Sequence, residues 1–210
     1  MQIQNKLIFI FLVILFLFKN IFYLNAEEFN IAADEIVIDK AKNIITGTGS
    51  VVATDQNGRT VKADKIVYQK NNEVLLAEGD VKIFDLEKNI LKTDKATYDK
   101  INEIIVTYKN SKLMLEEGYT VSTNKIIYNE VQKIITSNQS SVLTDVDGNI
   151  AKVDMFQHSL EKNIFSSVGE IEIVDINKNK YFFKELYVDI KKNEMIGSDA
   201  SALFDQDSFG

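Results

Sequence analysis

The feature that most constrains the fold of this 210-residue chain is an internal repeat of about 30 residues. Six units each open at an acidic or amide residue, and successive openers are 30, 30, 30, 30 and 31 positions apart. Repeats of this length stack, so that each unit covers the apolar face of its neighbour. The openers are Asp34, Asp64, Asp94, Asn124, Asp154 and Glu185.

Each unit has the pattern of two β-strands. In the second unit Ile66 and Tyr68 alternate with Lys65 and Val67, a period of two that predicts a strand with one buried face. An apolar pair follows ten positions after each opener, and amide-rich stretches such as Asn71-Asn72 separate the two strands as a turn.

Two further columns, meaning positions that recur at the same place in successive units, predict where the chain bends. Glycine recurs at the fifteenth position, as in Gly79, and interrupts an otherwise β-branched stretch, which is typical of a bulge at a sheet corner. Aspartate recurs at the twenty-first position and predicts the turn into the next unit. These aspartates are Asp55, Asp85, Asp145 and Asp175.

The predicted fold is therefore all-β, a stack of about six two-stranded repeats. No segment after residue 27 has helical spacing, and the chain contains no proline, which suits a fold that is mostly paired strand. One interior wall is predicted to carry Ile36, Ile66, Ala96, Ile126, Phe156 and Tyr187, beside Ile38, Tyr68, Tyr98, Tyr128 and His158. The facing wall is predicted to carry Val51, Val81 and Ile171, beside Ala53, Ile83, Leu113, Leu143, Ile173 and Phe204.

The N-terminus has the pattern of a secretory signal. Lys6 precedes an apolar run, and a cleavage position follows Ala26, so residues 1–26 are expected to be a signal peptide and 27–205 the repeat domain. The alternative is an uncleaved anchor, because residues 7–24 come close to the length that spans a bilayer. Residues 206–210 are expected to be a truncated junction. Either interpretation places the domain outside the cytoplasm.

Charge and composition exclude several functions. The net charge is −7 and Arg59 is the only arginine, so nucleic acid is not expected as a partner. The chain has no cysteine, and its single histidine, His158, occupies the tyrosine column, so no catalytic residue, metal or cofactor is predicted. Residues 145–148 resemble a calcium loop only faintly and are interpreted as a turn. Recurring lysines such as Lys65 and Lys125 are expected on a solvated outer face, the alternative being contact with anionic head groups.

These columns resemble the OstA-like repeats of lipopolysaccharide transport. The residues that carry the resemblance are Ala63-Asp64-Lys65-Ile66-Val67-Tyr68, the apolar pair and Glu78-Gly79-Asp80-Val81, and the similarity extends from Phe29 to about Asp205. It implies an open, twisted β-jellyroll whose apolar interior holds lipid A acyl chains. The closing stretch, residues 195–210, looks most like the N-terminal periplasmic region of the outer-membrane assembly protein LptD, with the periplasmic bridge protein LptA second.

The resemblance implies a Gram-negative periplasmic or outer-membrane location, lipopolysaccharide as ligand, and an outer-membrane barrel absent from this chain. The expected lipid-binding residues are Ile36, Ile38, Ile66, Tyr68, Tyr98, Ile126, Tyr128, Phe156, Val81, Ile83, Leu113, Leu143 and Ile173. Other OstA-like proteins are expected to join end to end by strand pairing. The expected pairing edge contains Phe29, Ile31, Ile36, Val37 and Ile38. The alternative function is a structural or adhesive solenoid without lipid.

Overall fold

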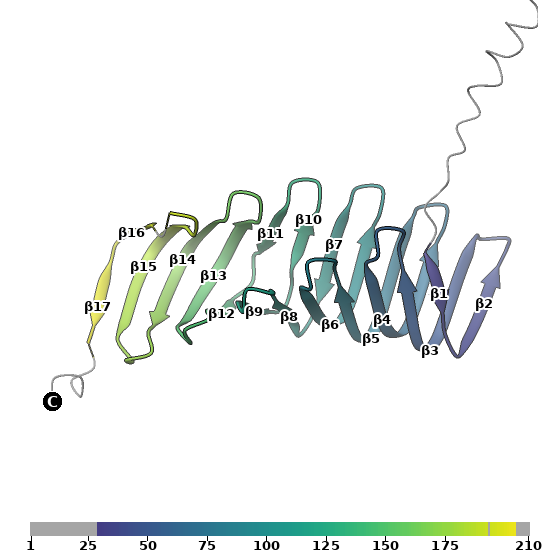
Figure 1. Ribbon diagram of the computed structural model, residues 1–210, viewed down its shortest axis with the longest axis horizontal. Helices are drawn as coiled ribbons and strands as arrows, with labels where there is room; N and C mark the ends of the chain where they lie inside the picture. Colours follow the sequence, from purple (N-terminus) through teal and green to yellow (C-terminus); the bar gives the residue numbers. More distant parts are fainter. Residues whose placement is uncertain (1–28, 193, 205–210) are drawn as a thin grey trace, which may run out of the picture.

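The computed structural model describes residues 29–192 and 194–204, and this part of the chain is all-β (Figure 1). Its strands form one 17-stranded sheet in which every pairing is antiparallel. The strands are β1 (Asn30–Ala32), β2 (Glu35–Asp39), β3 (Ile44–Thr54), β4 (Thr60–Gln69), β5 (Val74–Phe84), β6 (Ile90–Asp99), β7 (Ile104–Tyr108), β8 (Ser111–Met114), β9 (Thr120–Thr123), β10 (Ile127–Asn129), β11 (Ile134–Ser137), β12 (Ser141–Thr144), β13 (Ile150–Ser159), β14 (Ile164–Val174), β15 (Lys180–Asp189), β16 (Glu194–Ser198) and β17 (Ser201–Leu203).

The long strands bend in the middle, so that a single meander forms two facing walls. The register of β3 against β4 shifts between Thr48 and Val51, and β4 against β5, β5 against β6, β13 against β14 and β14 against β15 shift at the equivalent points. In the middle of the chain the bend becomes a break, which divides the strand into the pairs β7/β8, β9/β10 and β11/β12. We call the wall containing β2, β7, β10, β11 and β16 the first wall, and that containing β1, β8, β9, β12 and β17 the second.

The corner between the walls explains both the glycine column and the acidic openers. Gly79 has a φ of +78°, and a Cβ there would collide with the Asp64 carboxylate, which packs against the bend. Where the third unit lacks glycine, Lys109 takes the positive φ at that position, and the next residue, Asn110, donates a 2.8 Å hydrogen bond to Asp94. The predicted corner glycine is therefore confirmed, and Asp64 is the residue that packs against it.

A single apolar core lies between the walls and confirms the predicted alternation. Ile66 and Val81 are completely buried on opposite walls. The sixth unit differs from the prediction because the true spacing stays at 30: Phe156 aligns through Ser167 with Leu186, which is buried. Tyr187 is 41% exposed, and Phe204 is also exposed, so the assignment of both to interior ribs was wrong.

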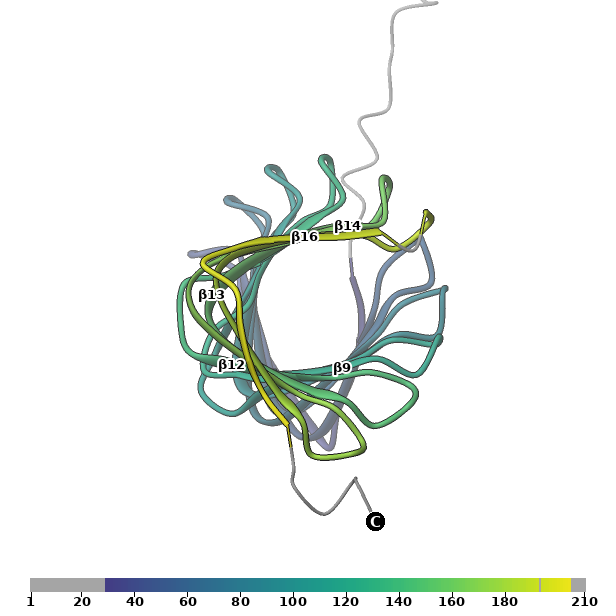
Figure 2. The same ribbon diagram turned by 90° about the vertical axis from the view of Figure 1, so that its left-hand side faces the viewer.

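The turns of the meander form two lips that flank an open side, opposite the corner (Figure 2). The lip of the first wall contains residues 40–43, 70–73, 100–103, 130–133 and 160–163, and that of the second wall contains residues 55–59, 85–89, 115–119, 145–149 and 175–179. Asp55, Asp85, Asp145 and Asp175 each accept a hydrogen bond from the backbone N–H four residues later, at 2.8–2.9 Å. The predicted turn role of this column is confirmed.

The two ends of the molecule are sheet edges. β1 and β2 pair only with β3, while β16 and β17 pair only with β15 among the described strands (Figure 1). No helix long and apolar enough to cross a membrane occurs in residues 29–192 and 194–204. The predicted signal peptide and junction lie outside the described residues.

Candidate functional site

A cavity lies between the two walls in the middle of the chain and opens between the lips. Its volume is about 320 Å³, within the range of ~300–1,000 Å³ usual for ligand sites. Second-wall strands contribute Ile83, Leu91 and Leu113, and the first wall contributes Tyr98, Ile105, Ile126, Tyr128 and Ile135. The floor is therefore aliphatic and aromatic, as a binding site for hydrocarbon requires.

The rim of this groove is charged. Arg59, Asp85 and Glu87 come from the lip of the second wall, while Lys100, Glu103, Glu130 and Lys133 come from the lip of the first. Three cations and four anions thus surround an apolar floor. An amphiphile whose chains enter the groove would leave its polar part beside this rim.

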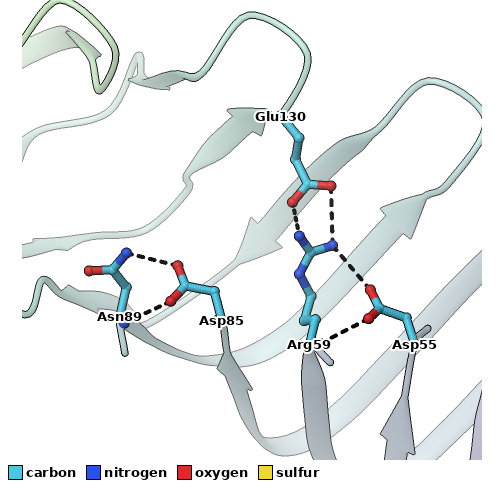
Figure 3. Close-up of polar contacts among 5 residues, drawn as sticks. All are labelled: Asp55, Arg59, Asp85, Asn89 and Glu130. Atoms are coloured by element: carbon cyan, nitrogen blue, oxygen red, sulfur yellow. Dashed lines mark hydrogen bonds and ion pairs between the residues drawn. The ribbon is translucent and has the colours of Figure 1, made fainter. Parts of the chain in front are cut away.

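Arg59 crosses the open side. Its side chain makes a two-pronged ion pair with Glu130, in which Nη1 donates to Oε2 at 3.1 Å and Nη2 donates to Oε1 (Figure 3). Asp55 receives the Arg59 backbone N–H at 2.8 Å and lies 3.8 Å from Nη1. The Arg59 and Glu130 side chains are only 16% and 8% exposed, so the pair is largely withdrawn from water. We call this pair the clasp.

Electrostatics keep the clasp charged. Burial, the largest single influence, would lower the pKa of Arg59, but the charges of Glu130 and Asp55 together with Tyr98 outweigh it, and the pKa is raised. Arg59 also lies over the ring of Tyr98, 5.0 Å from its centroid, a cation–π contact. Burial, and then the charge of Glu130, raise the pKa of Tyr98, so its hydroxyl stays neutral.

The structure brings five of the thirteen predicted lipid-binding residues to this groove: Ile83, Tyr98, Leu113, Ile126 and Tyr128. Ile66, Tyr68, Val81 and Phe156 are buried elsewhere in the same interior, and Leu143 and Ile173 pack against it half-buried. Ile36 and Ile38 are 45% and 59% exposed, because β2 ends the stack and no further unit covers them. They share the columns of Ile66 and Tyr68, as predicted, and their role in lipid binding stays a prediction.

Sequence reasoning missed several groove residues. Ile105 and Ile135 belong to the recurring apolar pair, whose second member points inward, and this column could have been added to the predicted ribs. Leu91, Leu115 and Leu160 also line the groove. The repeat pattern gives no signal for Glu130, because its role depends on Arg59, a partner 71 residues away in the sequence.

The predicted pairing edge is corrected at Phe29. Its ring is buried and packs edge-on against Tyr68 and Tyr98, with centroid distances of 5.3 and 6.1 Å. Phe29 therefore belongs to the interior, whereas Ile31 is half-buried on β1 and Val37 is exposed on β2.

His158 and Asp145, the residues considered above for catalysis and for calcium binding, have structural roles. His158 faces Ile135 and Phe165 in the aromatic column, and burial lowers its pKa, with Glu117 acting in the opposite direction. The Asp145 carboxylate accepts hydrogen bonds from the backbone N–H groups of Asp147 and Asn149 and from the Asn149 side-chain amide. Across the described ranges, no three His, Cys, Asp or Glu side chains are grouped to hold a metal ion.

No protein-family model matches the sequence, and no curated protein matches it. One similar solved structure is the crystal structure of LptH, the LptA homologous periplasmic component of the conserved lipopolysaccharide transport device from Pseudomonas aeruginosa. It is 19% identical, covers 49% of this chain and 76% of its own, and has a TM-score of 0.45. At this TM-score the likeness assigns neither a family nor a function to the chain.

Proposed function

We propose that this chain binds the acyl chains of lipopolysaccharide in its groove and passes them along the stack towards outer-membrane assembly. The observation that carries the proposal is the apolar floor between the walls, open to one side and bordered by a charged rim. The OstA-like pattern of residues 63–68 and 78–81 supplies the identity of the lipid. Lpt-type members of that family act in the Gram-negative periplasm, which is the location we propose.

The energetics suit passive transport. Each methylene removed from water gains ~0.8 kcal/mol, so a chain held on a continuous apolar floor is bound without any chemical step. Neighbouring units offer equivalent floors, because Ile83 and Leu113 occupy the same column 30 residues apart. A guest can therefore move from one unit to the next with little change in free energy.

The open edges supply a route beyond this molecule. Ile36 and Ile38 continue the columns of Ile66 and Tyr68 but are exposed, and β2 has no neighbour on its outer side among the described strands. A second OstA-like protein that pairs with β2 would cover both residues and extend the apolar floor. Assignment to the LptD N-terminal region, with LptA second, remains a prediction from the closing stretch.

The register identifies the outward N–H groups of β2. Lys70 N–H donates to the Asn43 carbonyl at 3.0 Å, so residues 43 and 70 form a hydrogen-bonded pair. Alternation along β3 then directs Ile44 and Thr46 towards β2, which leaves the N–H groups of Ile36 and Ile38 facing the free edge. The outward donors thus belong to the two residues whose side chains extend the floor, and Val37 donates inward.

Photo-crosslinking tests the ligand. A photoreactive phenylalanine analogue at Tyr128, on the groove wall, should capture lipopolysaccharide in cells. The matched control is the same analogue at Tyr108, an exposed tyrosine near the end of β7. Equal capture at both positions, or capture at neither while the protein is folded, would contradict the proposal and favour the alternative function, a structural or adhesive solenoid that carries no lipid.

Strand pairing is tested separately by Ile38→Pro, which removes an outward N–H, with Ile38→Ala as the control that keeps it. We expect the proline variant to lose binding to a purified LptA-type protein in a pull-down. The alanine variant should retain most of that binding. If both variants bind equally well, the contact between the proteins does not use β2.

A further inference from the structure

One contact across the open side recurs along the stack with a fixed offset. Phe29, directly before β1 of the second wall, contacts Lys100 in the lip of the first wall, 71 residues later, and Lys100 Nζ lies 5.9 Å from the ring centroid. Arg59 reaches Glu130, again 71 residues later. The next pair in this series is Asn89 and Leu160, and both residues line the groove. Equivalent positions in three successive repeats can therefore be compared directly.

The first two pairs cover the open side. Phe29 fills the space above Tyr68 and Tyr98 with a buried aromatic ring. Arg59 also contacts the Tyr98 ring and ties the two lips together through Glu130. Over the first two repeats, a guest cannot pass between the lips unless these contacts separate.

The third pair does not cover it. Asn89 directs its polar atoms to its own lip: its amide donates to Asp85 at 2.8 Å, and its side-chain oxygen accepts from the Glu116 N–H at 3.1 Å. Leu160 has a hydrocarbon side chain and offers no polar group in return. At this point both sides of the opening belong to the apolar groove.

We propose that the gap between Asn89 and Leu160 is a lateral port, through which an acyl chain enters and leaves the groove between the lips. The Arg59–Glu130 clasp is the barrier that closes the preceding repeat to such exchange, and Phe29 covers the repeat before that. Acyl chains then reach the N-terminal edge by moving along the interior, under the clasp. This inference rests on the proposed acyl-binding function and adds where and how the ligand gains access.

Two cysteines placed 30 residues apart test the port, since the chain has no cysteine of its own. Val61→Cys lies two residues after Arg59, and Leu91→Cys lies two residues after Asn89; both native side chains are buried on the second wall. Each full-length variant is treated with hexadecyl methanethiosulfonate, and the labelling rate is followed by mass spectrometry. We expect the Leu91→Cys variant to react roughly tenfold faster than the Val61→Cys variant. The clasp must break before the reagent reaches the cysteine at position 61, and breaking one charged hydrogen-bonded contact lowers the open population by about this factor.

Removing the clasp should abolish the difference. Glu130→Gln added to Val61→Cys should bring its labelling rate close to that of the Leu91→Cys variant, while the same substitution added to Leu91→Cys should leave the rate nearly unchanged. Glu116→Gln is the matched control, because it removes the same charge from an ion pair with Lys88 that stays within one lip. Equal rates for the two cysteine variants with the clasp intact, or acceleration of both by Glu130→Gln, would overturn the proposal.

A second reagent separates failure of the port from failure of the proposed function. Methyl methanethiosulfonate is small and has no acyl chain, so it reports access alone. If it shows the same ratio of rates but the hexadecyl reagent labels neither cysteine, the clasp controls access to a groove that does not accept acyl chains. If neither reagent distinguishes the cysteines while the Tyr128 analogue captures lipid, the groove binds lipid without a port. Circular dichroism confirms that each variant remains folded.

Discussion

Two neighbouring turns of the same lip, residues 55–59 and 85–89, have the same backbone and differ in what they do (Figure 3). In both, the aspartate accepts the N–H of the fifth residue at 2.8 Å. In the first turn that residue is Arg59, which reaches across to Glu130; in the second it is Asn89, which turns back to Asp85. Register and turn chemistry thus define the architecture, while a single side chain determines whether the open side is covered.

The largest expected effect is on stability, and it compares a covered with an uncovered position of the same column. Ile66 and Ile36 share a column, but Ile66 is fully buried whereas Ile36 lies on the uncovered end strand. Ile66→Ala should lower the free energy of unfolding by about 2–5 kcal/mol. Ile36→Ala should lower it by less than about 1 kcal/mol, since exposed positions contribute little. Urea denaturation measures the free energy of unfolding of both variants. Equal losses would mean that a residue's column, and not its burial by a neighbouring unit, determines its contribution to stability.

The corner that the two turns share can be tested next. Gly79→Ala adds a Cβ at a positive φ and against the Asp64 carboxylate, so we expect the free energy of unfolding to fall by about 1–3 kcal/mol. Gly148→Ala is the control: its φ is also positive, but a Cβ there would meet only Ile176, at 3.8 Å. A similar loss in both variants would show that backbone strain acts alone, without the Asp64 contact.

The comparison itself can be reversed by moving the clasp one repeat along. Asn89→Arg combined with Leu160→Glu places the clasp residues at the equivalent positions of the third repeat. Added to Leu91→Cys, this pair should slow hexadecyl labelling by roughly tenfold, the effect of one charged hydrogen-bonded contact. Asn89→Arg alone is the control, because it adds bulk without a partner. If the single and double substitutions slow the reaction equally, bulk rather than pairing covers the groove.

The smallest effect concerns His158, half-buried in the aromatic column beyond the port. Because burial lowers its pKa, the unfolded chain takes up a proton that the folded chain resists. The associated stability is fully present above the ordinary histidine pKa of about 6.5 and falls as the pH drops through the lower, folded value. His158→Phe should remove this component from urea midpoints measured at neutral and acidic pH. An unchanged pH dependence would assign it to other groups.

Much of the fold was predictable from the sequence because its signals are local. The strand period around Ile66, the turn aspartates and the corner glycines each depend on neighbouring residues, and the structure confirms them. The sixth unit was misaligned by one position because Glu185 looks like an opener, whereas the pairing with β14 aligns Lys184 with that column.

The candidate site was less predictable because it depends on distant pairs. Phe29 looked like the start of an edge strand, yet its ring is buried against Tyr68 and Tyr98, which follow it by about 40 and 70 residues. The clasp likewise joins two different positions of the repeat that lie 71 residues apart. A 30-residue repeat indicates which residues share a column, but it does not indicate how far a side chain crosses between the walls.

The meander also has a kinetic consequence. The long strands bond to the long strands just before and after them, so most pairings form between residues close in sequence, and such topologies fold quickly for an all-β chain. The clasp is an exception, since Arg59 and Glu130 are 71 residues apart. It can close only after the intervening strands have assembled, and so it forms late. Loss of the clasp should therefore accelerate unfolding and leave the folding rate almost unchanged.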